Sequence, residues 1–136
     1  FIGNLMQLFP NLKYNILGIS NELPKWNYNF YNELIKCKMS LNLSRGKPLK
    51  YTSSNRIAAL IGNGIFTFID EKTKFRDFFN DSEVGFYKNV DDLGNKIEYL
   101  LKHPNKINKF AKQGRAKYFK LFNNKLITNQ IIQKTF

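Results

Sequence analysis

Residues 54–70, SNRIAALIGNGIFTFID, carry the clearest secondary-structure signals in the chain. The first half places apolar residues at helical spacing behind Ser54, a suitable N-cap residue. Gly62 or Gly64 can then end the helix as a C-cap. The second half, IFTFID, is a short run of β-branched and aromatic residues, typical of a buried strand. A helix followed directly by a buried strand indicates an α/β layer fold.

The segments on either side continue this alternation. Apolar runs predict four strands, over residues 13–19, 39–44, 64–70 and 83–87. Apolar residues at helical spacing predict helices over residues 1–9, 27–39, 54–62 and 91–103, a helical turn at 74–79, and one or two basic helices over 104–136. The sequence therefore predicts a Rossmann-like, mostly parallel sheet flanked by helices, with a helical C-terminal tail.

Length and composition narrow the class of protein. The chain has 136 residues, 43% of them hydrophobic, which suits one domain with its own core. One cysteine excludes an internal disulfide, and one Cys with one His cannot form a cysteine-based zinc site. No apolar run reaches the roughly 18 residues of a membrane span, and no signal peptide is recognised. We expect a cytoplasmic protein and, because the chain begins at Phe1, a piece of a longer polypeptide.

The net charge of +12 is concentrated at the C-terminal end. Residues 101–136 contain nine basic residues and no acidic ones, and their apolar residues recur at helical spacing. One interpretation is a surface helix with a solvated lysine face, since 18 Lys, 18 Asn and only 4 Arg also fit an AT-rich genome. The other interpretation is a basic face that contacts an anionic membrane surface or, with less support, nucleic acid.

The loop NLSRGKPLKYTSSNR, residues 42–56, is the best candidate for a binding site. It follows a predicted strand, enters a predicted helix, and contains no acidic residue. Helix N-termini with free N–H groups favour anions, phosphate above all. The predicted phosphate-binding residues are Arg45, Lys47, Lys50, Ser53, Ser54 and Arg56. The alternative is that Ser54 only caps the helix and the basic side chains are solvated.

The chain offers no clear catalytic residue. His103 precedes Pro104 at a helix end, which favours a capping role over that of a base. Asp91 and Asp92 open a predicted helix, where acidic residues interact favourably with the helix dipole. Neither a glycine–lysine phosphate loop nor a GxGxxG fingerprint is present. The catalytic residues are therefore left unassigned.

Two stretches resemble a known family: SSNRIAALIGNGIFTFID (53–70) and SEVGFYKNVDDLGNKIEYLLKHPNKINKFAKQGRAKYF (82–119). A basic residue opens a helix at Arg56, and a glycine ends it at Gly64 before a strand. A glycine–aromatic segment, an Asp-Leu helix start and a paired-helix motif ending in Gly-Arg follow at 85–87, 92–93 and 103–115. Together they resemble the C-terminal half of GT-B glycosyltransferases, in particular the group-1 set related to spore-maturation glycosyltransferases. The resemblance extends from about residue 13 to residue 122.

The resemblance implies a donor-binding domain. Such enzymes transfer a sugar from a nucleotide-sugar donor to an acceptor, and a separate N-terminal domain usually carries the acceptor site and the base. Residues 45–54 and Arg56 would then face the donor diphosphate, and the strand end at Asp70 would lie near the sugar or the base. No metal and no further cofactor is expected. The missing N-terminal domain would be a partner of this chain.

The sequence departs from the family pattern at two positions. Many members carry two glutamates eight positions apart, the second of which binds the donor ribose. The matching residues here are Tyr51 and Ala59, which have no carboxylate. The alternative function is therefore a non-catalytic α/β module whose basic tail binds nucleic acid or an anionic membrane surface.

Overall fold

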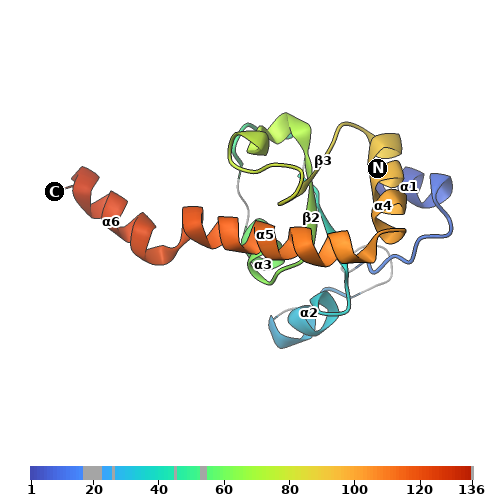
Figure 1. Ribbon diagram of the computed structural model, residues 1–136, viewed down its shortest axis with the longest axis horizontal. Helices are drawn as coiled ribbons and strands as arrows, with labels where there is room; N and C mark the ends of the chain where they lie inside the picture. Colours follow the sequence, from blue (N-terminus) through green and yellow to red (C-terminus); the bar gives the residue numbers. More distant parts are fainter. Residues whose placement is uncertain (17–22, 26, 45, 53–54, 136) are drawn as a thin grey trace.

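A three-stranded parallel sheet forms the centre of the computed structural model, which describes residues 1–16, 23–25, 27–44, 46–52 and 55–135 (Figure 1). Its strands are β1 (Met39–Asn42), β2 (Phe66–Asp70) and β3 (Gly85–Tyr87), in the order β1-β2-β3. Both neighbouring pairs are parallel. The predicted α/β fold with a parallel sheet is confirmed.

Helices connect and flank these strands. They are α1 (Ile2–Leu8), α2 (Asn27–Leu34), α3 (Asn55–Gly62), α4 (Val90–Leu101), α5 (Pro104–Phe122) and α6 (Asn124–Thr135), with two 3₁₀ turns, η1 (Glu71–Thr73) and η2 (Phe75–Asp77), between β2 and β3. The tail predicted over residues 104–136 thus forms two helices, α5 and α6. In the part of the chain that the structure describes, no helix is both long and apolar enough to cross a membrane.

Alternation along β2 builds a core on each face of the sheet. Phe66 and Phe68 point to one face and pack with buried residues of α1, α4 and the first half of α5, among them Leu93 and Ile107. Ile69 points to the other face, as the period of two in a strand requires. Both faces of β2 are buried, which is why its sequence is a continuous apolar run.

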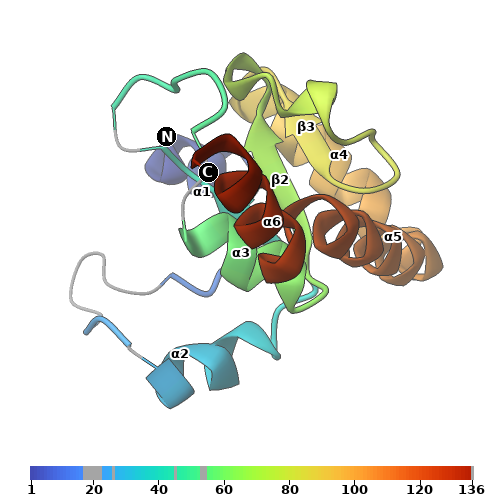
Figure 2. The same cartoon turned by 90° about the vertical axis from the view of Figure 1, so that its left-hand side faces the viewer.

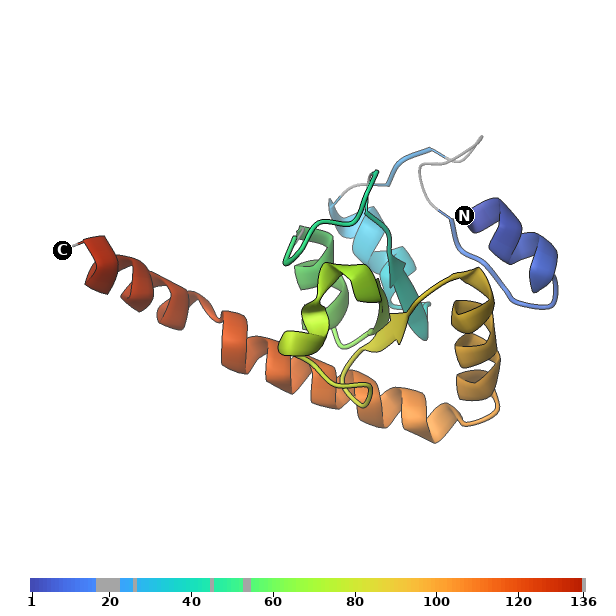
Figure 3. The ribbon, with the colours of Figure 1, turned by 90° about the horizontal axis from the view of Figure 1, so that it is seen from above.

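The second core joins α3 and the 3₁₀ turns to the end of α5. Ile57 and Ile61 of α3 pack with Ile69 and with Phe86 of β3. Tyr118 and Phe122, near the end of α5, pack against the same cluster. The helix α5 therefore borders both cores as it runs past the sheet (Figure 3).

A glycine permits α5 to approach the sheet closely. A Cβ on Gly114 would lie 2.1 Å from the backbone oxygen of Glu83, just before β3. Backbone cannot yield to that contact, so only glycine fits at this position.

The end of α3 is set by Gly64, not Gly62. Gly64 has a positive φ of 75°. Its N–H donates to Ile61 O at 2.9 Å, and the N–H of Ile65 donates to Leu60 O at 3.1 Å. This is the Schellman pattern of helix termination, with glycine in the left-handed position.

Two predicted elements differ from the structure. Residues 13–16 are not a strand, because the Tyr14 hydroxyl donates to Leu5 O and Phe9 O and ties the segment to the end of α1. The rest of that predicted strand, 17–19, lies outside the described residues. The predicted helix over 27–39 ends at Leu34, since Met39 must already pair with Phe66 in the sheet. The shortened α2 packs through Phe30 and Leu34 beside α3 (Figure 2).

Candidate anion-binding site

An open cleft of about 280 Å³ lies at the carboxyl end of β1. The residues that line it come from the end of this strand, the loop that follows and the first turn of α3: Asn42, Leu43, Ser44, Lys47, Leu49, Thr52 and Arg56. Loops at the carboxyl ends of parallel strands are where α/β sheets bind ligands. The cleft therefore occupies the position that the sequence predicted for a binding site.

The charged residues that the structure describes in this cleft are both basic. Lys47 and Arg56 line it, and none of its described lining residues is acidic. Arg56 lies in the first turn of α3, where the helix dipole disfavours a cation and favours an anion. The Arg56 Nη1 donates to Leu43 O at 2.8 Å, which places the guanidinium against the loop that follows β1. An anion in the cleft would relieve the repulsion between these cations and the dipole.

Tyr51 lies in the same loop, between the lining residues Leu49 and Thr52. Its φ is +58°, a left-handed conformation that is uncommon for a non-glycine residue. Its N–H donates to Thr73 O at 2.9 Å, its hydroxyl donates to the Asp77 carboxylate, and its ring meets Phe78 edge-on at 5.2 Å. We call these contacts the Tyr51 clasp. They attach the loop after β1 to the segment after β2.

The structure divides the predicted site residues into three groups. Lys47 and Arg56 line the same cleft. Lys50 is not among the described residues that line it, and its ammonium lies 4.6 Å from the centroid of the Tyr51 ring. Arg45, Ser53 and Ser54 lie outside the described residues.

Several lining residues were not predicted from the sequence. Asn42, Ser44 and Thr52 add polar atoms to the cleft. A polar residue that ends an apolar strand, as Asn42 does, is a signal that could have identified the first of them. The partnership of Tyr51 with Asp77 spans 26 residues and has no local sequence signal.

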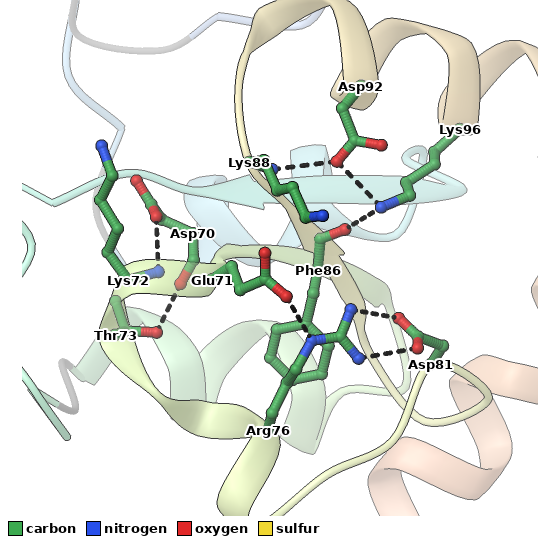
Figure 4. Close-up of polar contacts among 10 residues, drawn as sticks. All are labelled: Asp70, Glu71, Lys72, Thr73, Arg76, Asp81, Phe86, Lys88, Asp92 and Lys96. Carbon is green, nitrogen blue, oxygen red and sulfur yellow. Dashed lines mark hydrogen bonds and ion pairs between the residues drawn. The ribbon is translucent and has the colours of Figure 1, made fainter.

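Asp70, expected near the sugar or base, stabilises the turn after β2 (Figure 4). Its Oδ1 accepts a hydrogen bond from the Lys72 N–H at 2.8 Å, and its carbonyl accepts one from Thr73 Oγ1 at 2.7 Å. Burial raises the pKa of the neighbouring Tyr87 to about 12, and the negative charge of Asp70 adds to this shift.

Arg76 holds together the segment between β2 and β3 (Figure 4). It pairs with Glu71 at 2.8 Å and, through two nitrogens, with Asp81 at 2.8 and 3.2 Å. Its guanidinium carbon lies 4.5 Å from the centroid of the Phe86 ring, and hydrogen bonding to Asp81 raises its pKa. Because two carboxylates already neutralise this cation, we interpret it as structural.

The start of α4 explains its acidic residues. Asn89 is the N-cap and accepts from the Asp92 N–H, while Asp92 accepts from the Lys88 N–H and from Lys96 Nζ, each at 2.9 Å. Burial raises the pKa of Asp92, but the hydrogen bonds from Lys96 and Lys88 outweigh it and leave that pKa below its usual value. The helix-start role of Asp91 and Asp92 is confirmed. His103 occupies the N-cap of α5, with Nδ1 2.7 Å from Tyr99 O.

The parallel sheet, with a basic cleft at its carboxyl edge, defines a Rossmann-like α/β domain. The family model described as glycosyl transferase-like matches residues 1–133, and the chain belongs to this family. This confirms the resemblance to a GT-B-like glycosyltransferase domain. Neither the curated proteins nor the solved structures that were compared include a match.

Proposed function

We propose that this chain is the donor-binding part of a glycosyltransferase and that the cleft at the end of β1 holds the diphosphate of a nucleotide sugar. The observation that carries the proposal is the convergence of Lys47 and Arg56 on one cleft beside the N-terminus of α3. Family membership supports a sugar-transferring enzyme. The donor base, the sugar and the acceptor are left open.

The chemistry of the cleft suits a diphosphate. Two cations provide charge, and the hydroxyls of Ser44 and Thr52 can donate to phosphate oxygens. Lys50, beside the Tyr51 ring, would add a longer-range attraction from outside the cleft. The volume of the cleft, about 280 Å³, is just below the roughly 300–1,000 Å³ of pockets that enclose whole ligands. The base and the sugar would therefore extend beyond it.

The same residues could assist the reaction. Negative charge develops on the diphosphate as its bond to the sugar breaks, and cations already in position stabilise that charge. Lys47 and Arg56 would supply this stabilisation without a metal ion. The residue that activates the acceptor is unassigned, and the proposal places it outside this chain, in the N-terminal domain of the complete enzyme.

A second candidate function has one specific observation in its favour. Ala59 stands where the family pattern has its ribose-binding glutamate, and the hydroxyl of Tyr51, at the other glutamate position, is engaged with Asp77. Ribose recognition by those carboxylates is therefore lost. A member that binds a diphosphate but does not transfer sugar would show the same features.

Titration calorimetry with uridine, guanosine and thymidine diphosphates and their sugars tests the proposal. We expect at least one to bind with a Kd below about 1 mM, in competition with pyrophosphate. Absence of binding by every nucleotide would contradict the proposal. Binding without release of nucleoside diphosphate from the matching sugar donor, in the presence of the complete enzyme, would favour the non-catalytic candidate.

A further inference from the structure

The outer face of α5 carries a row of lysines that no acidic residue balances. Ile107, Ala111 and Gly114 are the buried residues of this helix. Lys109, Lys112 and Lys120 lie on the opposite side of the helix, and Lys117 lies on its flank; we call these four lysines the lysine ridge. Three of them are exposed and Lys117 is half-buried. At 1.5 Å per residue the ridge is roughly 16 Å long.

No acidic residue of the tail neutralises the positive charge of the lysine ridge. Residues 101–136 contain no Asp or Glu, and the ion pairs found among the described residues all involve acids between Glu33 and Asp92. Like charges one turn apart destabilise a helix. An anionic surface laid along α5 would remove that repulsion.

Exposed aliphatic residues lie next to the ridge on α6. This helix extends α5 away from the sheet, and all of its residues, every one of which is described, are exposed (Figures 1 and 3). Its four large aliphatic side chains are between 38% and 59% exposed: Leu126, Ile127, Ile131 and Ile132. Side chains of this kind gain free energy when they enter the acyl region of a bilayer.

The details of α5 favour lipid over nucleic acid. Arg115, the only arginine of the tail, is turned away to donate to Gly62 O at 2.8 Å. Tyr118 and Phe122 pack on the second core, which removes them as platforms for stacking bases. Phe119 is 47% exposed, but the Arg115 guanidinium lies 5.2 Å from the centroid of its ring. A lysine-rich face on α5, followed by exposed aliphatic side chains on α6, provides non-specific attraction to anionic headgroups and a means of insertion.

We propose that the lysine ridge and α6 together dock this chain on an anionic membrane surface. The proposal is independent of the diphosphate site, because the ridge and the cleft share no residue. Most of the positive charge of the tail would then serve a lipid contact, and would not merely reflect an AT-rich genome.

Co-sedimentation with phosphatidylcholine vesicles, with and without phosphatidylglycerol, tests this docking. We expect binding only to the anionic vesicles, and release of the chain at high salt. Substituting the ridge as K109Q/K112Q/K117Q/K120Q should weaken partitioning up to roughly a thousandfold, at about 1 kcal/mol for each lysine. The matched control K13Q/K38Q/K72Q/K88Q removes the same number of positive charges from exposed positions elsewhere and should retain at least most of the binding.

A second pair of variants tests the aliphatic part. I127N and I131N alter side chains that contact no core, so folding should be retained, and each should weaken vesicle binding severalfold. Equal weakening by the ridge and control variants would overturn the proposal, because net charge alone would explain it. Absence of vesicle binding, or a salt-dependent gel shift with DNA or RNA in its place, would overturn it as well.

Discussion

Arg56 is the side chain on which the proposed diphosphate site depends most. Arg56→Ala should weaken nucleoside diphosphate binding by about 1.5–3 kcal/mol, or roughly ten- to 150-fold in Kd, because a charge-assisted contact is lost. The Kd of Arg56→Lys should lie between those of the unaltered protein and Arg56→Ala, since lysine keeps the positive charge but lacks the planar guanidinium. Calorimetric titration of the three proteins measures both effects.

Arg115 provides the matched control for Arg56. Each arginine donates one hydrogen bond of 2.8 Å to a backbone carbonyl, Arg56 to Leu43 O and Arg115 to Gly62 O. Arg115→Ala should therefore lose similar stability but leave diphosphate binding intact. Equal weakening by both alanine variants would mean that Arg56 acts through folding and not through contact with phosphate.

Tyr51 positions the loop that lines the cleft. Tyr51→Phe removes only the hydroxyl that bonds Asp77, so we expect a loss of about 0.5–1.5 kcal/mol in stability. Diphosphate binding should also weaken severalfold, because the loop must then be ordered at the expense of binding. Urea unfolding and calorimetry measure the two effects, with Tyr28→Phe, at a 76% exposed tyrosine, as the control. An unchanged Kd in Tyr51→Phe would show that the clasp does not position the site.

For single residues, the charge of the loop can be predicted from the sequence, but the residues with which its side chains form contacts cannot. Lys47 and Arg56 were predicted from a basic loop before a helix, which is a local pattern, and both line the cleft. Asp77 could not be paired with Tyr51, since that contact depends on how two loops meet at the edge of the sheet. Lys50 illustrates the same limit: its charge is visible in the sequence, but its position over the Tyr51 ring is not.

At the scale of elements, the approach of α5 to the strand β3 depends on one glycine. Gly114→Ala should destabilise the protein by about 1–3 kcal/mol, because the added methyl would meet the backbone oxygen of Glu83. Gly62→Ala is the matched variant: Gly62 is the last helical residue of α3, and nothing lies within 4 Å of its Cβ position. It should be stabilising by about 0.5–1 kcal/mol. Urea unfolding measures the stability of both variants. An unchanged free energy of unfolding in Gly114→Ala would contradict the close approach of α5 to Glu83.

The start of α4 should make stability depend on acid pH. The folded state lowers the pKa of Asp92 below its usual value of 3.8, so the stabilisation is complete above that value and is lost as the pH falls through the folded-state pKa. Asp92→Asn should therefore cost about 0.5–1.5 kcal/mol at neutral pH and progressively less in acid. Unfolding curves across this range measure the difference, with Asp91→Asn in the same turn as control. A difference that stays constant with pH would contradict the assignment.

Elements with strong local signals were predicted from the sequence, and those set by distant contacts were not. β2 and α3 were found because burial on both faces and a glycine C-cap leave local patterns. Residues 13–16 resembled a strand, but the Tyr14 hydroxyl binds carbonyls at the end of α1. The early end of α2 likewise follows from pairing between Met39 and Phe66.

For the whole molecule, the net charge of +12 separates into two basic surfaces with different expected ligands. The cleft brings Lys47 and Arg56 together beside the N-terminus of α3, a position that suits a small anion. The lysine ridge on α5 is open and suits an extended surface. Because the two share no residue, vesicle binding and diphosphate binding should be lost independently in the variants described above.

The central claim is that the cleft at the end of β1 binds diphosphate, and amide chemical-shift mapping during titration with nucleoside diphosphates tests it most directly. We predict saturable shifts confined to residues 42–56 and to Thr73 and Asp77 across the Tyr51 clasp. At the same ligand concentration Arg56→Ala should reduce these shifts strongly, in line with the ten- to 150-fold rise expected in Kd. Shifts that cluster instead on α5, or the absence of any saturable shift for every diphosphate, would contradict the claim.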